Sequence, residues 1–469
     1  MKDIEKDLSR KPAPAKTTST KPVEIPVLPE GRLPAVIISP PFSGWLARFG
    51  RALKRHRKVV SCIQWLFVIL YFSLLLLPLL LPDEINGSFY SSVPDFSRLM
   101  FWGIGWPAII LSMMLVGRVW CGLFCPDGTL TEFISRHGQK RSIPRWIRWK
   151  GWPCTVLVTT VLYGQLIGVY EHFPATLILL GIPTGMALAC GFLYGNGKRI
   201  WCMYLCPGNG IFELLAKLSP VYYKVDEKEW QAYSGKTERL DCPTLINVRQ
   251  MRSMSACHAC GRCIGHRKAV EPAFRSPSAE ILATSKNHVS DSETFLLLWG
   301  IIGICTAALA WRGNSLYAFF LSLPGSVHTS GLPWYVAASP ESLLRLVFIL
   351  ISGSAIALAT YVLLRLSTLI SGKAECWKQL ALCLIPVSGT GIFLGLCQIS
   401  FTLWQAYGIN PEWIPALQPL ILVWAALFSV WLGFKTICHR ISTASLIALL
   451  VYCLPIALLC SIWIIHFHA

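Results

Sequence analysis

Eight of the eighteen cysteines stand in spaced sets whose thiolates could hold metal. Three of them form the run Cys257-x2-Cys260-x2-Cys263, and Cys242 lies a short distance upstream, followed by a proline. A run with this spacing is typical of iron–sulfur ligation, whereas a structural zinc site usually shows two separated C-x2-C pairs. The spacing therefore predicts one [4Fe–4S] cluster, held by Cys242, Cys257, Cys260 and Cys263.

The cysteines missing around this run support the same interpretation. In two-cluster ferredoxins the pattern C-x2-C-x2-C-x3-C-P occurs twice, and the fourth cysteine of each run ligates the other cluster. Here the first run keeps only Cys242 and Pro243, and the second has Arg267 where its fourth cysteine would fall. The losses remove every ligand of one cluster and keep every ligand of the other.

A second set of thiols comes from an internal duplication. The sequence RVWCxxxCP at 118–126 recurs as RIWCxxxCP at 199–207. Two cysteines four residues apart share one face of a helix, so two neighbouring hairpins could bring four thiols together. The alternative is that these residues only mark helix ends at the membrane interface, but the matching flanks argue against it. The four thiols are those of Cys121, Cys125, Cys202 and Cys206.

The spacing of the duplicated cysteines leaves open what they hold. A second iron–sulfur cluster, zinc and copper(I) all accept soft thiolate ligands, so the prediction is a metal or redox role without a named metal. Glu132 and Glu213 follow at the same distance in both copies and are expected to be solvated. No catalytic acid–base pair or nucleophile stands out.

Membrane helices must position these cysteines. The 469 residues are 54% hydrophobic and 14% charged, about half the charged share of a soluble domain. We expect an all-α polytopic membrane protein with a small cytoplasmic ferredoxin-like insertion, because nine apolar runs reach the roughly 17–25 residues that a span needs. The runs are drawn at 59–81, 99–116, 152–170, 174–194, 294–311, 346–364, 380–402, 416–434 and 444–465.

The net charge of +18 follows membrane topology and does not indicate nucleic-acid binding. With nine spans and a cytoplasmic N-terminus, the only lysines or arginines outside the cytoplasmic side are Arg98, Arg312 and Arg345. Positive residues retained in the cytoplasm set the orientation of membrane helices. We therefore expect a multi-pass protein of the bacterial inner membrane, in contact with lipid, with a cytoplasmic N-terminus, a periplasmic C-terminus and no nucleic-acid partner.

Four segments follow from these patterns. Residues 1–58 are expected to form a disordered basic tail rather than a cleaved signal, because the first apolar run begins too late. Residues 59–220 form a four-span domain with the duplicated motif, 221–293 the ferredoxin-like segment, and 294–469 a domain of about five spans whose role the sequence does not indicate. The cysteines in or beside spans are expected to be packing residues.

The duplicated motifs RVWCGLFCPDG and RIWCMYLCPGNG, followed by ACHACGRC at 256–263, resemble those of the membrane-bound polyferredoxin group. That group includes NapH- and NosR-type proteins of nitrogen-oxide respiration and CcoG-type accessory proteins of oxidase assembly. The resemblance covers about residues 55–278 and implies electron transfer at the cytoplasmic face of the membrane. NapH and NosR types serve quinol-linked routes, whereas CcoG types reduce copper.

Three functions are consistent with these features. The first is an electron-transfer protein of a respiratory chain, which passes electrons between the [4Fe–4S] centre, the paired cysteines and a membrane partner or quinone. The alternative is a copper-reducing or copper-handling accessory protein for cytochrome oxidase assembly. A transporter or sensor regulated by the cluster ranks third, because residues 294–469 place no charge deep in a span.

Overall fold

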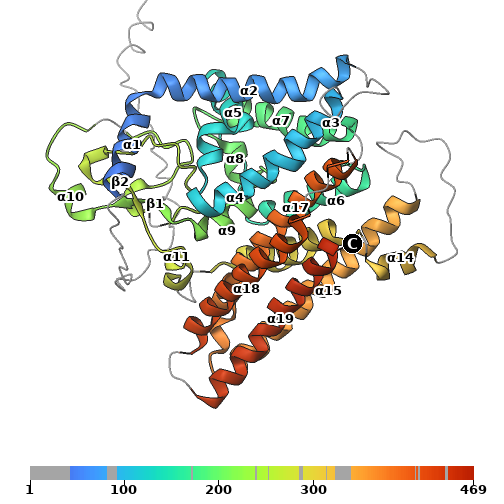
Figure 1. The fold of residues 1–469 in the computed structure, drawn as a ribbon. Helices are drawn as coiled ribbons and strands as arrows, with labels where there is room; N and C mark the ends of the chain where they lie inside the picture. The colour runs from blue at the N-terminus through green and yellow to red at the C-terminus, as the bar shows by residue number, and fades with distance from the viewer. Residues whose placement is uncertain are drawn as a thin grey trace, which may run out of the picture. The chain divides into compact units, whose positions relative to one another are not determined.

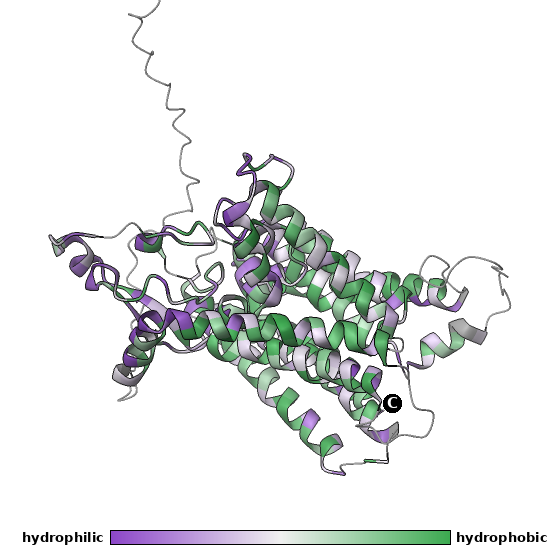
Figure 2. Ribbon diagram, turned by 90° about the horizontal axis from the view of Figure 1, so that it is seen from above, coloured by the Kyte–Doolittle hydropathy of each residue, from purple (hydrophilic) through white to green (hydrophobic). Residues whose placement is uncertain are grey.

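The computed structural model describes residues 43–81, 92–170, 173–237, 240–251, 253–284, 289–312, 314–322, 340–406, 408–409, 412–438 and 442–468. The fold is almost entirely helical (Figure 1), and among these described residues eight segments are long and apolar enough to cross a membrane. The predicted all-α polytopic fold is thereby confirmed. Figure 2 shows apolar residues along the long helices and hydrophilic residues at the end of the molecule that carries α1 (Ser43–Arg55).

The membrane-crossing segments follow in chain order. They are α2 (Arg57–Leu80), α3 (Val93–Arg98) with η1 (Leu99–Gly105) and α4 (Trp106–Val116), α7 (Phe173–Tyr194), α12 (Asp291–Phe295) with η6 (Leu296–Cys305) and α13 (Thr306–Ala310), α15 (Pro340–Ile370), η7 (Ala374–Cys376) with α16 (Trp377–Leu382) and α17 (Ile385–Ala406), α18 (Ile414–Ile437) and α19 (Thr443–His468). The short helix α14 (Ser315–Ser322) precedes α15.

One expected span is shorter than predicted. The run at 152–170 forms α6 (Trp152–Leu166), whose 15 residues are fewer than the about 20 that a span usually needs. Trp152 packs beside a cluster that contains Cys202, while Gln165 near the other end donates a hydrogen bond to Ala308 O at 2.7 Å. Both α4 and α7 end at the cysteines. The chain must therefore run back to the opposite end of the bundle between them, and α6 is the segment that does so.

Helix α1 lies within residues 1–58, the segment predicted to be a basic tail, and packs against the ferredoxin-like segment. Leu46, Ala47 and Gly50 form its buried face, and a Cβ on Gly50 would lie only 2.8 Å from the Pro272 side chain. Lys54 Nζ also donates to Ile264 O at 2.7 Å. The spacing of apolar residues on one face explains why this basic segment folds against its neighbour. Residues 1–42 of the predicted tail lie outside the described residues.

The ferredoxin-like segment is built on a two-stranded antiparallel sheet. Strand β1 (Val221–Val225) pairs with β2 (Val270–Phe274), with Tyr223 opposite Pro272. A small apolar cluster that includes Val248, Met251 and Met254 packs on Tyr223 and encloses part of the cysteine run. Between the strands lie α10 (Glu227–Ala232), η4 (Val248–Gln250) and η5 (His266–Lys268), and α11 (Ala279–Ala283) leads back to the bundle.

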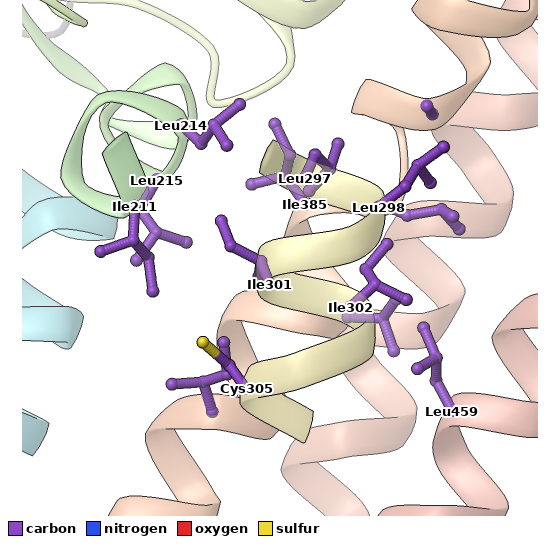
Figure 3. Packing of buried hydrophobic residues seen from close by; sticks show 14 of the residues in the cluster. Ile211, Leu214, Leu215, Leu297, Leu298, Ile301, Ile302, Cys305, Ile385 and Leu459 are labelled. Carbon is purple, nitrogen blue, oxygen red and sulfur yellow. The ribbon is translucent and has the colours of Figure 1, made fainter. Parts of the chain in front are cut away.

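The core of the bundle surrounds η6, which joins the two halves of the chain. In Figure 3, Ile301 faces Ile211 and Leu215 on one side, while Ile302 lies towards Leu459 on the other. The span containing η6 is 78% buried, compared with 11% for α2, so η6 is shielded from lipid by other helices. The C-terminal helices therefore support the region that carries the cysteines.

Candidate iron–sulfur sites

The first predicted cysteine set lines a single hollow. Cys242, Cys257, Cys260 and Cys263, called here the ferredoxin-segment site, line one hollow that is partly open to solvent. The remaining walls are mostly apolar and include Leu240, Pro243, Ile246, Val248 and Met251.

The backbone of the cysteine run curls around this hollow. Ala259 and Gly261 have left-handed φ angles of 48° and 73°, which turn the chain sharply between its cysteines. The Tyr223 hydroxyl of β1 donates to Ala259 O at 3.2 Å, and the Ala259 N–H points at Cys257 Sγ at 3.4 Å. Hydrogen bonds from backbone amides to sulfur are one way in which a protein tunes a cluster.

Burial favours the protonated form of two thiols of this site, Cys257 and Cys263. It raises the pKa of Cys257 well above its usual range and that of Cys263 to about 12, and neighbouring thiols add to both shifts. Ligation requires thiolates, so cluster binding would release these protons. In the part of the chain that the structure describes, no three Cys, His, Asp or Glu side chains surround one point as a single ion needs. Each thiolate of a [4Fe–4S] cluster binds a different iron, so thiols that line a hollow fit a cluster.

The duplicated motifs lie just beyond the ends of α4 and α7 and fold alike. The first cysteine of each copy sits in a short helix, η2 (Trp120–Phe124) or α8 (Ile200–Tyr204). The second cysteine of each copy follows this short helix and precedes a proline. It cannot continue the helix, because the residue before a proline favours an extended backbone. Its N–H donates to the tryptophan carbonyl in both copies, Cys125 to Trp120 at 2.9 Å and Cys206 to Trp201 at 3.0 Å. Helices α5 (Pro126–His137) and α9 (Asn209–Leu215), with η3 (Ala216–Leu218), follow.

The structure brings the two copies together, as predicted. Arg199, at the start of the second motif, donates from Nη1 to Cys121 O of the first at 2.5 Å. Burial raises the pKa of Cys202 well above its usual range and that of Cys206 to about 12, and Cys121 raises both further. We call Cys121, Cys125, Cys202 and Cys206 the repeat site.

Two buried arginines cross between the copies. Arg199 is 1% exposed and reaches Glu132 of the first copy, with Nε 2.9 Å from Oε2. Arg118 is 2% exposed and donates to Asn209 Oδ1 of the second copy at 2.7 Å and to Ser255 O at 2.8 Å. Each arginine therefore ties its own copy to the other one, in a pseudo-symmetric exchange.

Glu132 is buried and ion-paired, which corrects the prediction that it is solvated. It is 5% exposed and pairs with Arg199, with Arg136 at 2.7 Å and with Arg262 of the cysteine run. Burial raises the pKa of this carboxyl, but the arginines outweigh burial and hold it at about 2. Glu213 is also partly buried, and burial raises its pKa.

The two cysteine sites touch through backbone. A Cβ on Gly122 would lie 2.0 Å from His258 O and 2.9 Å from Cys260 N, so only a glycine allows this approach. Gly122 follows Cys121 directly, and His258 and Cys260 belong to the cysteine run. The ferredoxin-segment site and the repeat site are therefore adjacent.

Sequence reasoning missed the residues that surround the cysteines. Arg118 and Arg199 were visible only as matching flanks of the motif, and no role was assigned to them. His258, within the cysteine run, is 2% exposed and lines the hollow. The repetition of a positive charge three residues before each first cysteine was the available signal.

A family described as a 4Fe-4S binding domain matches the chain twice, over residues 99–144 and 176–222. Each match contains one copy of the duplicated motif, so iron–sulfur binding is confirmed for the chain. Residues 240–263 lie outside both matches. The assignment of individual ligands stays a prediction at both sites.

Three curated proteins resemble part of the chain. An uncharacterised protein of Methanocaldococcus jannaschii is 25% identical over 169 residues, 34% of this chain and 63% of its own length. YccM of Escherichia coli, provisionally named as an electron transport protein, is 23% identical over 184 residues, 34% and 50% of the two lengths. The regulatory protein NosR of Pseudomonas aeruginosa is 26% identical over 202 residues, 32% and 28%. The chain thus matches less than two thirds of the length of each relative, and no solved structure matches it.

These matches confirm the predicted resemblance. The chain is similar to a membrane-associated, polyferredoxin-like group of the NosR type.

Proposed function

We propose that this chain is an iron–sulfur electron-transport protein with two centres, one at the ferredoxin-segment site and one at the repeat site. The observation that carries the proposal is the contact of Gly122 with the backbone of His258 and Cys260. Electron exchange between two centres needs them to be close, and this contact places the residue after Cys121 against the backbone of Cys260. The double family match and the name of YccM support the same function.

The residues of the chain would hold each centre and limit its contact with water. A [4Fe–4S] cluster supplies one-electron exchange when bound. Cys242, Cys257, Cys260 and Cys263 would hold it in the hollow, where apolar walls lower the local dielectric and the Ala259 amide is aimed at a ligand sulfur.

The positions of the two sites suggest separate roles. The repeat site lies at the ends of α4 and α7, whereas the hollow of the ferredoxin-segment site is partly open to solvent. We infer that the repeat site exchanges electrons with a membrane partner or quinone and the ferredoxin-segment site with a cytoplasmic one. The positive loops predicted to face the cytoplasm support placing both at that face of a bacterial inner membrane, within a respiratory chain.

Metal content of the anaerobically purified protein tests this proposal. Two clusters predict about eight iron and eight acid-labile sulfide per chain, with EPR signals that develop on reduction with dithionite. Cys260→Ala and Cys202→Ala should each remove about half of the iron and a different EPR signal. Cys190→Ala, at a buried cysteine in α7, is the matched control and should keep all of the iron.

Other metal contents would contradict the proposal. Zinc without iron would exclude an electron carrier, and copper at the repeat site in place of iron would favour the copper-handling alternative. About four iron per chain would leave only one centre, and the variant that loses it would identify which one.

A further inference from the structure

Arg118 is a buried cation without an acidic partner. It is 2% exposed, and the two hydrogen bonds of its Nη atoms go to a neutral amide oxygen and a backbone carbonyl. Within the described ranges its Nε has no hydrogen-bond partner and Arg118 forms no ion pair with a carboxylate. Glu213 acts on it only at longer range. A charge buried in this way destabilises the protein unless something compensates it.

The pseudo-symmetric counterpart of Arg118 is an arginine whose charge is balanced by a carboxylate. Arg199 occupies the same position in the second copy and pairs with Glu132 at 2.9 Å. The two arginines therefore have the same sequence context and nearly the same burial but differ in net charge balance. Glu213 of the other copy acts on Arg118 without pairing with it, so a direct counter-charge for Arg118 needs another source.

The thiols of the repeat site are that source once they are ionised. Arg118 begins the turn that carries Cys121, and its backbone carbonyl accepts a hydrogen bond from the Gly122 N–H at 3.2 Å. Burial lowers the pKa of Arg118, whereas the neighbouring Cys121 and Cys206 raise it. A cluster with four thiolate ligands is anionic, because the thiolates outweigh the positive charge of its core. Binding of a cluster at the repeat site would thus place a negative charge next to Arg118.

We propose that Arg118 is the built-in counter-charge of an anionic iron–sulfur centre at the repeat site and raises the reduction potential of that centre. This inference rests on the proposed function. Reduction adds one electron to the centre, from dithionite in the test or from a redox partner, and breaks no bond. A fixed positive charge stabilises the form with the additional electron, so its removal makes reduction harder.

A redox titration followed by EPR tests the inference on the full-length protein. Arg118→Gln should shift the midpoint potential of the repeat centre, the one lost in Cys202→Ala, to more negative values. Arg118→Lys keeps the charge and should stay near the native potential. Arg48→Gln, at an exposed arginine of α1, is the control and should change neither centre.

The outcomes separate a charge effect from a structural one. An unchanged potential in Arg118→Gln with full iron content would overturn the inference, and so would equal shifts in Arg118→Lys and Arg118→Gln. If Arg118→Gln loses the repeat centre, retention of that centre in Arg118→Lys supports the counter-charge, whereas its loss there overturns it. Failure of the proposed function is distinct, because native protein would then lack a repeat centre altogether.

Discussion

The two cysteine sites are built in opposite ways. The ferredoxin-segment site has all of its predicted ligands within 242–263, and the local backbone, with left-handed residues at 259 and 261, curls around its own hollow. The predicted ligands of the repeat site come from two distant helix ends, which ion pairs and hydrogen bonds between the copies hold together. The first site therefore depends on local chain geometry and the second on tertiary packing.

The largest expected effect comes from breaking the packing that builds the repeat site. Glu132→Ala leaves Arg199 buried without its carboxylate, and removal of one partner of a buried ion pair costs about 3–5 kcal/mol. Denaturant unfolding in detergent micelles should show this loss, and iron should leave the repeat site before the ferredoxin-segment site. Glu227→Ala removes an exposed pair with Arg249 and should cost less than about 1 kcal/mol. Equal effects of the two substitutions would contradict the comparison.

The pH dependence of the same ion pair sharpens this test. The pKa of Glu132 falls from 4.5 to about 2 on folding, so its contribution is complete above the unfolded value and is lost only as pH falls towards about 2. The stability difference between native protein and Glu132→Gln should therefore stay constant from about pH 8 to pH 5. A difference that declines across this range would show that Glu132 titrates there.

An intermediate effect is expected where the two sites meet. Gly122→Ala would place a Cβ 2.0 Å from His258 O, which forces the cysteine run away from the repeat site. Overpacking of this kind costs about 1–3 kcal/mol, and magnetic interaction between the two centres in EPR spectra should weaken. Gly181→Ala is the control, since a Cβ there meets nothing within 4 Å. Unchanged coupling in Gly122→Ala would argue against this contact as the link between the centres.

The smallest expected effect lies within the ferredoxin-segment site. Tyr223→Phe removes the hydrogen bond to Ala259 O and should cost about 1 kcal/mol. Only the centre lost in Cys260→Ala should change its EPR signal, because the bond lies within that segment. Tyr222→Phe is the control, because it makes the same change of Tyr to Phe at the neighbouring position of β1. A change at the repeat centre would show that the sites are less independent than their construction indicates.

The membrane fold, the duplicated motif and the iron–sulfur character of the chain could all be predicted from the sequence. Hydropathy and cysteine spacing are local properties, so they are visible without knowledge of the packing. Tertiary packing establishes that Glu132 is buried, that Arg118 and Arg199 cross between the copies, and that Gly122 touches the cysteine run. It also establishes that the 15-residue α6 returns the chain between α4 and α7. These features depend on how helices far apart in the sequence pack against one another. No local sequence pattern specifies which charged side chains form ion pairs.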